Sequence, residues 1–182
     1  TATDLTDEWQ AQERLRHLSL HDALTGLANR RQLHEFLAAR LDPTAGGEPA
    51  VTVLCLDLDR FKPINDALGH ALGDQVLQEV ARRLQALVGP RELAARLGGD
   101  EFILVLAGTL PPEEVDRRCA AVVAALARPF QLGDHTVQTG TSIGVALAPL
   151  HARTADELLR QGDIALYDAK AAGRNTWRCY TQ

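Results

Sequence analysis

The chain has 182 residues, of which 46% are apolar and 24% charged, and its formal net charge is -5. This length and apolar content suffice for one hydrophobic core, so we expect one domain plus a short N-terminal extension. An acidic chain lacks the basic face that displaces counterions from nucleic acid, which argues against broad nucleic-acid binding. No apolar run is long enough to span a bilayer, and residues 1–4 do not resemble a signal peptide.

We therefore expect a cytoplasmic domain. The sequence contains no methionine, including at position 1, which is typical of an excised fragment. A membrane anchor or a second domain in the parent protein stays open. The three cysteines have no metal-type spacing, and their odd number does not suit a disulfide framework, so we interpret them as reduced residues.

The first half of the chain predicts two helices and a buried strand. Residues 5–20 favour a helix with a narrow apolar stripe, interpreted either as a helix folded back on the domain or as a coiled-coil stalk that transmits a signal. Gly26 interrupts this pattern before a second helix that runs to Leu41, and a Pro- and Gly-rich loop follows at 43–49. Residues 51–58 form an apolar run typical of a strand buried on both faces, where Cys55 has a packing role.

The second half predicts alternating helices and hairpins. After a polar turn we expect a helix over 73–88, a hairpin of 92–97 with 102–106, and an amphipathic helix that ends at Arg128. A second hairpin is predicted between 130–132 and 136–148, with Gly133 and Asp134 at its turn. The last helix opens on a capping box at 154–157, ends near Gly173, and precedes an edge strand at 176–180. This order indicates an α+β sheet covered by helices.

The hairpin turn Gly98-Gly99-Asp100-Glu101-Phe102 is the most informative segment. A glycine pair between two apolar runs favours a tight turn, because glycine adopts the positive φ angles that such turns require. Without side chains at Gly98 and Gly99, a bulky ligand can lie against the backbone. Asp100 and Glu101, if adjacent in a strand, project to opposite faces, so that one can bind a metal while the other does something else. Taken alone, a charged surface turn is the more common interpretation.

A second acidic segment ends the apolar strand. Asp57 and Asp59 are two residues apart, which points both carboxylates to one face of a strand. Mg²⁺ prefers a few carboxylate oxygens together with water and substrate phosphates, so one or two of these aspartates with one hairpin carboxylate would suffice. An acidic strand end is also commonly just solvated.

Further polar residues follow at spacings that suit a nucleotide. Lys62 offers a cation for phosphate, while Asn65 and Asp74 suit the edge of guanine, whose N1–H and exocyclic amine are donors. Asp74 has the alternative interpretation of a helix N-terminal charge. Lys170 and Arg174 are four residues apart and lie on one helix face, where they can neutralise phosphates or simply be solvated. No P-loop sequence is present.

These segments, in this order, resemble the GGDEF family of diguanylate cyclases from about Ser19 to Tyr180. The matching motifs are Asp22-Ala-Leu-Thr-Gly-Leu-Ala-Asn-Arg30, Asp57-Leu-Asp-Arg-Phe-Lys-Pro-Ile-Asn-Asp66, Gly69-His70, Gly73-Asp74, Arg96-Leu-Gly-Gly-Asp-Glu-Phe102, Ser142-Ile-Gly-Val145, Ala165-Leu-Tyr-Asp-Ala-Lys170 and Gly173-Arg174-Asn175. The resemblance implies a central, mostly antiparallel five-stranded sheet flanked by helices, similar to the palm of nucleotide cyclases and polymerases, with a ferredoxin-like core. It also divides the chain into a signalling helix or linker at 1–20 and a GGDEF domain at 21–182.

The activity implied by the resemblance is the condensation of two GTP into cyclic di-GMP with release of two pyrophosphates. Mg²⁺ or Mn²⁺ would be held by Asp57, the Leu58 carbonyl and Asp100, with Glu101 as a further metal ligand or a helper in deprotonating the 3′-hydroxyl. The same resemblance assigns guanine to Asn65 and Asp74, the base pocket to Leu24, and phosphates to Lys62, Lys170, Arg174 and the backbone of residues 60–62. Phe61, Gly98 and Gly99 complete the expected substrate contacts.

The partners implied are GTP, cyclic di-GMP, a second copy in a two-fold homodimer, an upstream sensory domain and a downstream EAL domain. Two other functions stay open. One is a non-catalytic GTP-binding module that regulates a phosphodiesterase in a tandem GGDEF–EAL protein, and the other is a cyclic di-GMP receptor.

One departure from the family pattern concerns inhibition by the product, cyclic di-GMP. Family members with product inhibition carry Arg-x-x-Asp that ends six residues before the first signature glycine, and the matching positions here are Gly89 and Glu92. Arg91 lies close but out of register. We expect the inhibitory site to be degenerate.

Overall fold

The computed structural model describes residues 2–181, and its main feature is a five-stranded sheet in the order β2-β3-β1-β6-β7. The strands are β1 (Val51–Asp59), β2 (Leu93–Gly98), β3 (Glu101–Ala107), β6 (Gly140–Ala148) and β7 (Trp177–Cys179). All neighbours are antiparallel except β6 and β7, which are parallel. The predicted α+β class and mostly antiparallel sheet are confirmed.

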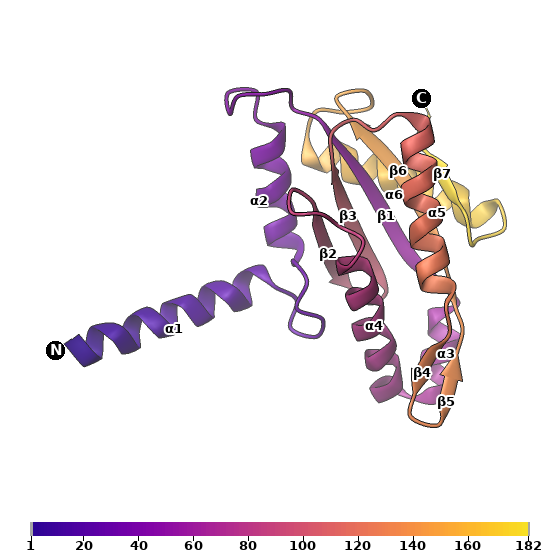
Figure 1. Cartoon of the computed structure of the whole chain (residues 1–182), viewed down its shortest axis with the longest axis horizontal. Coiled ribbons are helices and arrows are strands. Elements are labelled where there is room, and N and C mark those ends of the chain that lie inside the picture. Colours follow the sequence, from indigo (N-terminus) through magenta and orange to yellow (C-terminus); the bar gives the residue numbers. More distant parts are fainter. Residues whose placement is uncertain (1, 182) are drawn as a thin grey trace.

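Helices cover both faces of this sheet (Figure 1). Along β1 the side chains alternate, so that Leu54 and Leu56 pack with α4 (His70–Gln85) and α5 (Pro112–Ala127). Val53 and Cys55 face the opposite side, toward α2 (Arg30–Leu41) and α6 (Ala155–Ala171). The predicted strand buried on both faces and the packing role of Cys55 are confirmed.

Helix α1 (Ala2–Leu20) extends away from the rest of the chain (Figure 1). Its apolar residues Leu5, Trp9 and Leu15 are each more than 60% exposed. The interpretation of a helix folded back on the domain is therefore wrong for this structure. The interpretation of a projecting stalk stays a prediction.

Two predictions about local structure are wrong. The expected polar turn after β1 is the helix α3 (Phe61–Leu68), and α4 begins at His70 instead of Gly73 and ends at Gln85. Phe61, Ile64 and Leu68 pack against the core at helical spacing, which explains why the segment folds as a helix. The predicted strand at 136–148 is divided into β5 (His135–Val137), which pairs with β4 (Phe130–Leu132), and β6, which joins the central sheet.

A close contact between two glycines fixes the position of α6 against the sheet. A Cβ atom on Gly144 of β6 would lie 2.1 Å from the Gly162 carbonyl oxygen and 2.2 Å from the Leu166 amide nitrogen. A Cβ on Gly162 would in turn lie 2.5 Å from Cys55 Sγ. Because backbone approaches backbone here, α6 lies closer to β1 and β6 than any side chain at position 144 permits.

We predict that Gly144→Ala lowers the free energy of unfolding by about 3 kcal/mol or more, because backbone atoms of α6 must move to admit the methyl group. Chemical denaturation followed by circular dichroism measures this value. Gly89→Ala is the matched control, since its Cβ would have no neighbour closer than 3.8 Å. Equal stabilities of the two variants would contradict the close-packing argument.

Candidate active site

The β2–β3 turn presents two carboxylates at the edge of the molecule where β1 ends. Gly98 pairs with Glu101, so the two loop residues are Gly99 and Asp100, one position later than the glycine pair itself. Gly98 and Gly99 have φ angles of +136° and +50°, which only glycine adopts without strain. Asp100 therefore lies in the turn and only Glu101 in the strand. The prediction that both side chains project from one strand to opposite faces is wrong.

The last residues of β1 bring a third carboxylate to this turn. Asp57 is the register partner of Glu101, so their side chains lie on one face of the sheet. Its Oδ2 atom accepts a hydrogen bond from Lys170 Nζ of α6. Its Oδ1 atom is buried and has no hydrogen-bond partner within residues 2–181. A buried carboxylate oxygen without a partner is costly, and a bound cation would remove that cost.

Burial and mutual repulsion raise the pKa values of the carboxylates around Asp57. Burial and the charge of Asp57 raise the pKa of Asp100, against the effect of its own amide, of Lys170 and of the Leu58 amide. Burial and the charges of Asp57, Asp163 and Asp100 raise the pKa of Glu101, which Arg30 partly offsets. A group of acids whose pKa values are raised in this way is typical of a site that binds a cation or moves a proton.

Asp163 belongs to this group and was missed by the sequence analysis. Burial and the charge of Asp57 raise the pKa of Asp163, while Arg30 and Lys170 lower it. The residue lies on α6 two turns before Lys170, so both point to the same side of the helix. That seven-residue spacing was visible in the sequence, but nothing local related it to Asp57.

The donor set fits magnesium only with help from a substrate. No group of three or more His, Cys, Asp or Glu side chains in the described part of the chain is arranged to hold a metal by itself. Asp57 supplies a free oxygen, Asp100 approaches the Leu58 backbone, and the Leu58 carbonyl belongs to the same strand. Magnesium commonly uses one or two carboxylates and completes its shell with water and phosphate oxygens, so these residues fit it.

Asp59 has a structural role instead of a free carboxylate. It is 8% exposed; its Oδ1 accepts a hydrogen bond from Ser142 Oγ at 2.7 Å, and its Oδ2 accepts one from the Asn175 amide at 2.9 Å. The bond to Asn175 fixes the segment between α6 and β7. Of the two aspartates that end β1, Asp57 is therefore the one with an oxygen left for a cation.

The predicted base-binding residues lie on α3, on α4 and in the turn before α2. The Asn65 side chain contacts Gly73, where an added Cβ would lie 2.0 Å from Asn65 Oδ1, so α3 and α4 are in close contact at this point. Asp74 is exposed in the second turn of α4, four residues after its start, and does not cap the helix. Leu24 packs partly against the core, and its carbonyl accepts a hydrogen bond from Gln78 at 3.2 Å.

The side chains predicted to bind phosphate differ in the contacts that they make. Lys62 is exposed in the first turn of α3, and Phe61 next to it packs on the core. Lys170 is held by Asp57, whereas Arg174 is exposed and has a φ of +66° in the segment between α6 and β7. The structure thus brings Asp57, Asp100, Glu101 and Lys170 together, while Lys62, Asn65 and Asp74 follow along α3 and α4.

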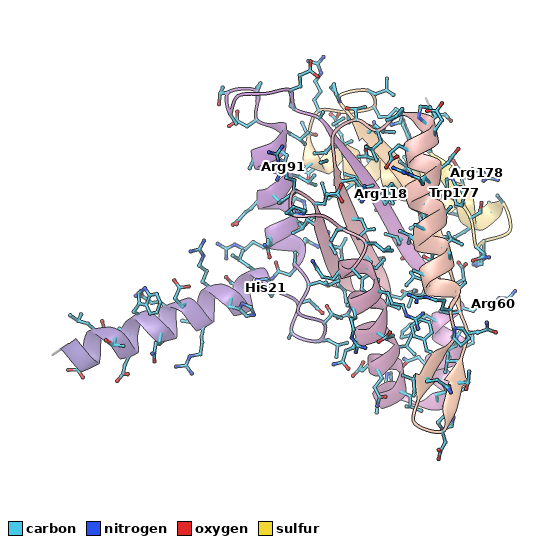
Figure 2. The ribbon with its side chains drawn as sticks, viewed as in Figure 1. His21, Arg60, Arg91, Arg118, Trp177 and Arg178 are labelled. Atoms are coloured by element: carbon cyan, nitrogen blue, oxygen red, sulfur yellow. The ribbon has the colours of Figure 1, made fainter. Side chains whose placement is uncertain are left out.

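The two positions expected to form a degenerate inhibitory site, Gly89 and Glu92, are joined by an internal contact. Glu92 accepts hydrogen bonds from Arg118 at 2.6 Å, from the Gly89 amide at 3.0 Å and from the Ala107 amide at 3.1 Å. Burial tends to raise the pKa of Glu92, but these donors outweigh it and hold the pKa below its ordinary value. Arg118, which is labelled on α5 in Figure 2, supplies the guanidinium of this contact.

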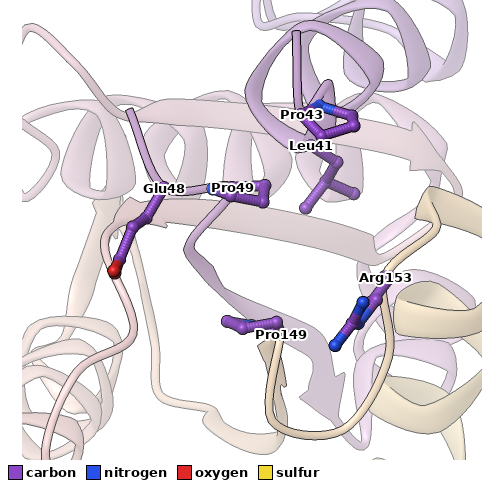
Figure 3. Close-up of a pocket in the computed structure, with 6 residues that line it drawn as sticks. All are labelled: Leu41, Pro43, Glu48, Pro49, Pro149 and Arg153. Carbon is purple, nitrogen blue, oxygen red and sulfur yellow. The ribbon is translucent and has the colours of Figure 1, made fainter. Parts of the chain in front are cut away.

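An apolar cavity of about 550 Å³ lies where β1 begins and β6 ends, at the opposite end of β1 from Asp57. It is lined by Leu41, Pro43, Glu48, Pro49, Pro149 and Arg153 (Figure 3). None of these residues belongs to the carboxylate group, so the cavity is separate from the candidate active site.

Comparison with known proteins assigns the family. The profile described as "Diguanylate cyclase, GGDEF domain" matches residues 19–176, and the chain therefore belongs to the GGDEF family. The chain is 39% identical over 181 residues to the diguanylate cyclase TpbB of Pseudomonas aeruginosa strain UCBPP-PA14, covering 96% of this chain and 42% of TpbB. It is 37% identical over 181 residues to the cyclic di-GMP phosphodiesterase PdeR of Escherichia coli K12, covering 100% of this chain and 27% of PdeR.

A solved structure agrees with the sequence matches. The GGDEF domain of Pseudomonas aeruginosa TpbB, in an N-terminally truncated variant, superposes with a TM-score of 0.83 at 40% identity, covering 88% of this chain and 94% of that one. The chain spans less than half the length of the two curated relatives, TpbB and PdeR. No helix among residues 2–181 has the length and apolar character needed to cross a membrane.

Arg96 connects the turn that precedes α2 with the β2–β3 turn. Arg96 donates to both carboxylate oxygens of Asp22, at 3.0 and 3.1 Å, and to the Gly99 carbonyl at 3.0 Å. Burial raises the pKa of Asp22, but hydrogen bonds from the Thr25 hydroxyl, the Thr25 amide and Arg96 outweigh it, so the pKa lies below its ordinary value of 3.8. Ionised Asp22 therefore stabilises the fold above pH 3.8, and this contribution disappears as the pH falls through the lowered pKa.

We predict that Arg96→Ala lowers the free energy of unfolding by about 2 kcal/mol at neutral pH, because Asp22 keeps its charge but loses a half-buried partner. The difference from the wild type should shrink as the pH falls below 3.8, since Asp22 becomes neutral in both proteins. Urea unfolding at several pH values tests this. Arg31→Ala, which removes an exposed ion pair with Glu35, is the control. A difference that stays constant with pH would contradict the assigned role of Asp22.

Proposed function

We propose that this domain is a diguanylate cyclase that condenses two GTP into cyclic di-GMP and two pyrophosphates, at the interface of a two-fold dimer. The observation that carries the proposal is the group of Asp57, Asp100 and Glu101, with a buried carboxylate oxygen of Asp57 left without a partner beside Lys170. Membership of the GGDEF family and the similarity to TpbB, a protein named as a diguanylate cyclase, support it.

Asp57, the Leu58 carbonyl and Asp100 would hold Mg²⁺ or Mn²⁺. The chemistry that the ion supplies when bound is polarisation of the α-phosphate and a lower pKa for the attacking 3′-hydroxyl. Glu101, with a raised pKa, is suited to accept the hydroxyl proton. The new bond joins O3′ to the α-phosphorus, the bond to the bridging oxygen breaks, and its electron pair leaves with pyrophosphate.

The remaining residues bind and orient the nucleotide. Lys62, Lys170 and Arg174 would neutralise the phosphates, with the backbone of residues 60–62 and of Gly98 and Gly99 close to the ligand. Asn65 and Asp74 would pair with the guanine edge beside Leu24 and Phe61. Each chain holds one such half-site, so the two GTP molecules must meet antiparallel across a two-fold axis, where alignment supplies much of the rate.

A second function is a GTP-binding regulatory module in a protein with a downstream EAL phosphodiesterase domain. The similarity to PdeR, a protein named as a phosphodiesterase of which this chain spans 27%, favours it. A receptor for cyclic di-GMP without turnover is less favoured, because the signature residues are intact and Glu92 is engaged by Arg118.

We predict that Asp57→Asn and Asp100→Asn each lower the rate of cyclic di-GMP formation by at least about a hundredfold, since each removes a charge that holds the cation. The rate is measured with GTP and Mg²⁺ at high protein concentration, and also for a version dimerised by an added coiled coil. Asp134→Asn, in the exposed β4–β5 turn, is the control. If the dimerised wild type binds GTP but forms no product, the proposal of a cyclase is wrong and the regulatory module is the function to retain.

We also predict that cyclic di-GMP inhibits the reaction weakly or not at all. Gly89 offers no side chain, and Glu92 is held by three donors, so neither is free to bind the product. Initial rates measured at increasing product concentration test this. A submicromolar inhibition constant would sink the prediction.

A further inference from the structure

Two histidine rings lie side by side where α1 ends. His17 belongs to the last turn of the helix, and His21 directly follows it. The two rings stack with their centroids 4.1 Å apart and their planes 21° from parallel. The His21 amide donates to the His17 carbonyl at 3.0 Å, so the helical turn continues between them. Residues four apart in a helical turn share one face, which places both imidazoles on the same side of the chain.

A hydrogen bond fixes the tautomer of His21. Its Nδ1 atom lies 3.1 Å from the Gly26 carbonyl oxygen, and a carbonyl oxygen can only accept, so Nδ1 carries the proton and donates it. In the neutral ring the lone pair is then on Nε2. Metal-binding histidines typically donate their second ring N–H to a carbonyl or carboxylate in this way. His21 is therefore oriented as a metal ligand by the turn that follows it.

His17 is open to the same ligand. Its ring is exposed, and within the described part of the chain its side chain has no hydrogen bond or ion pair. The rings of His34, His70 and His151, by contrast, each have a hydrogen-bond partner. The stacked pair thus offers Nε2 of His21 and a ring nitrogen of His17 to a cation from solvent.

The chemistry of this pair selects a late first-row divalent cation. Two histidines at i and i+4 on a helix have the spacing that binds Zn²⁺, and imidazole suits zinc, copper and nickel. Mg²⁺ prefers oxygen ligands and is disfavoured here. No third His, Cys, Asp or Glu side chain joins the pair in the described residues, so two protein nitrogens leave the remaining positions to water.

We propose that His17 and His21 form a binding site for Zn²⁺ or a similar divalent cation, separate from the carboxylates of the candidate active site. The site lies where α1 meets the rest of the chain (Figure 2). Because His21 is also bonded to Gly26, the ion would join the last turn of α1 to the turn that precedes α2. This inference goes beyond the proposed function and does not depend on it.

The test is isothermal titration calorimetry with ZnCl₂ in the absence of nucleotide. We expect His17→Ala to weaken Zn²⁺ binding by at least about tenfold, because one of two protein ligands is lost. Alanine is the best helix former, so this variant keeps α1. His17→Cys should retain tight binding, because a thiolate is also a zinc ligand, whereas a thiol cannot replace a ring that serves only for stacking.

His135→Ala is the matched control, since it removes an exposed histidine of β5. It should bind Zn²⁺ as the wild type does. Nitrogen NMR of the imidazole rings identifies the ligand atoms. With Zn²⁺ the Nε2 signal of His21 should move, while its Nδ1 stays protonated and bonded to Gly26.

Equal Zn²⁺ affinity in the wild type and His17→Ala would overturn the inference. Loss of Zn²⁺ binding in Asp57→Asn, with His17 and His21 intact, would also overturn it, because the ion would then be held by the carboxylates of the active site. The titration contains no GTP, so the two proposals fail separately. A dimerised protein that binds Zn²⁺ through His17 but makes no cyclic di-GMP would sustain the metal site and refute the cyclase.

Discussion

The contact between Asp57 and Lys170 is the interaction on which the site depends, because it joins the end of the central strand to the end of α6. An apolar strand buried on both faces can end in a carboxylate only where a partner offsets the loss of hydration. Lys170 satisfies one oxygen of Asp57 and leaves the other without a partner. The same pair therefore closes the core at this end and keeps one acceptor ready for a cation.

The position of Lys170 follows from packing far from the charges. Gly144 and Gly162 bring α6 into backbone contact with β6, and the helix then runs straight to Lys170. Asp163 lies on the same helix one residue beyond the glycine contact, which is why its charge reaches Asp57. A small change in the distance between helix and sheet would move both groups relative to the carboxylates of the β2–β3 turn.

A second contact connects the turn that follows α1 with the β2–β3 turn. Helix α1 projects from the domain, and the turn that follows it is fixed by Asp22, whose carboxylate is held by Arg96 of β2. Arg96 also holds the Gly99 carbonyl, next to Asp100. A displacement of the turn after α1 would thus be transmitted to the β2–β3 turn through one side chain. This arrangement suits a domain whose activity is set by a segment that precedes it.

The sequence specified the parts of this structure that depend on local pattern. The strand at 51–58, the glycine turn and the capping box of α6 were predictable, because alternation, glycine and Thr154 act over a few residues. Helix α3 could also have been predicted, since Phe61, Ile64 and Leu68 have helical spacing. The polar residues between them favoured the prediction of a turn. The strand at 136–148 was mispredicted because its two parts join different sheets, which no local signal records.

The site was predictable as a set of residues but not as an arrangement. Asp57, Asp100 and Glu101 follow from the motif, whereas the engagement of Asp59 by Ser142 and Asn175 is a contact across more than 80 residues. The burial and the repulsion by Asp57 that raise the pKa of Asp163 also arise only when α6 lies on β1. Distances between segments remote in sequence decide which carboxylates are free, and those distances are set by the packing of the sheet and its helices.

Under the proposed function, one chain would carry the groups that bind one nucleotide, and this would determine how the domain works. Asp57, Asp100, Glu101 and Lys170 gather at a single edge of one sheet. For a reaction that joins two equivalent nucleotides, a lone domain binds a substrate without a reacting partner. Turnover then requires two such edges to face each other, and the two ends of the nucleotide have different tasks. Under the proposed function, the base and phosphate contacts would hold each substrate in its own chain, while the 3′-hydroxyl would stay free to reach the α-phosphate in the other.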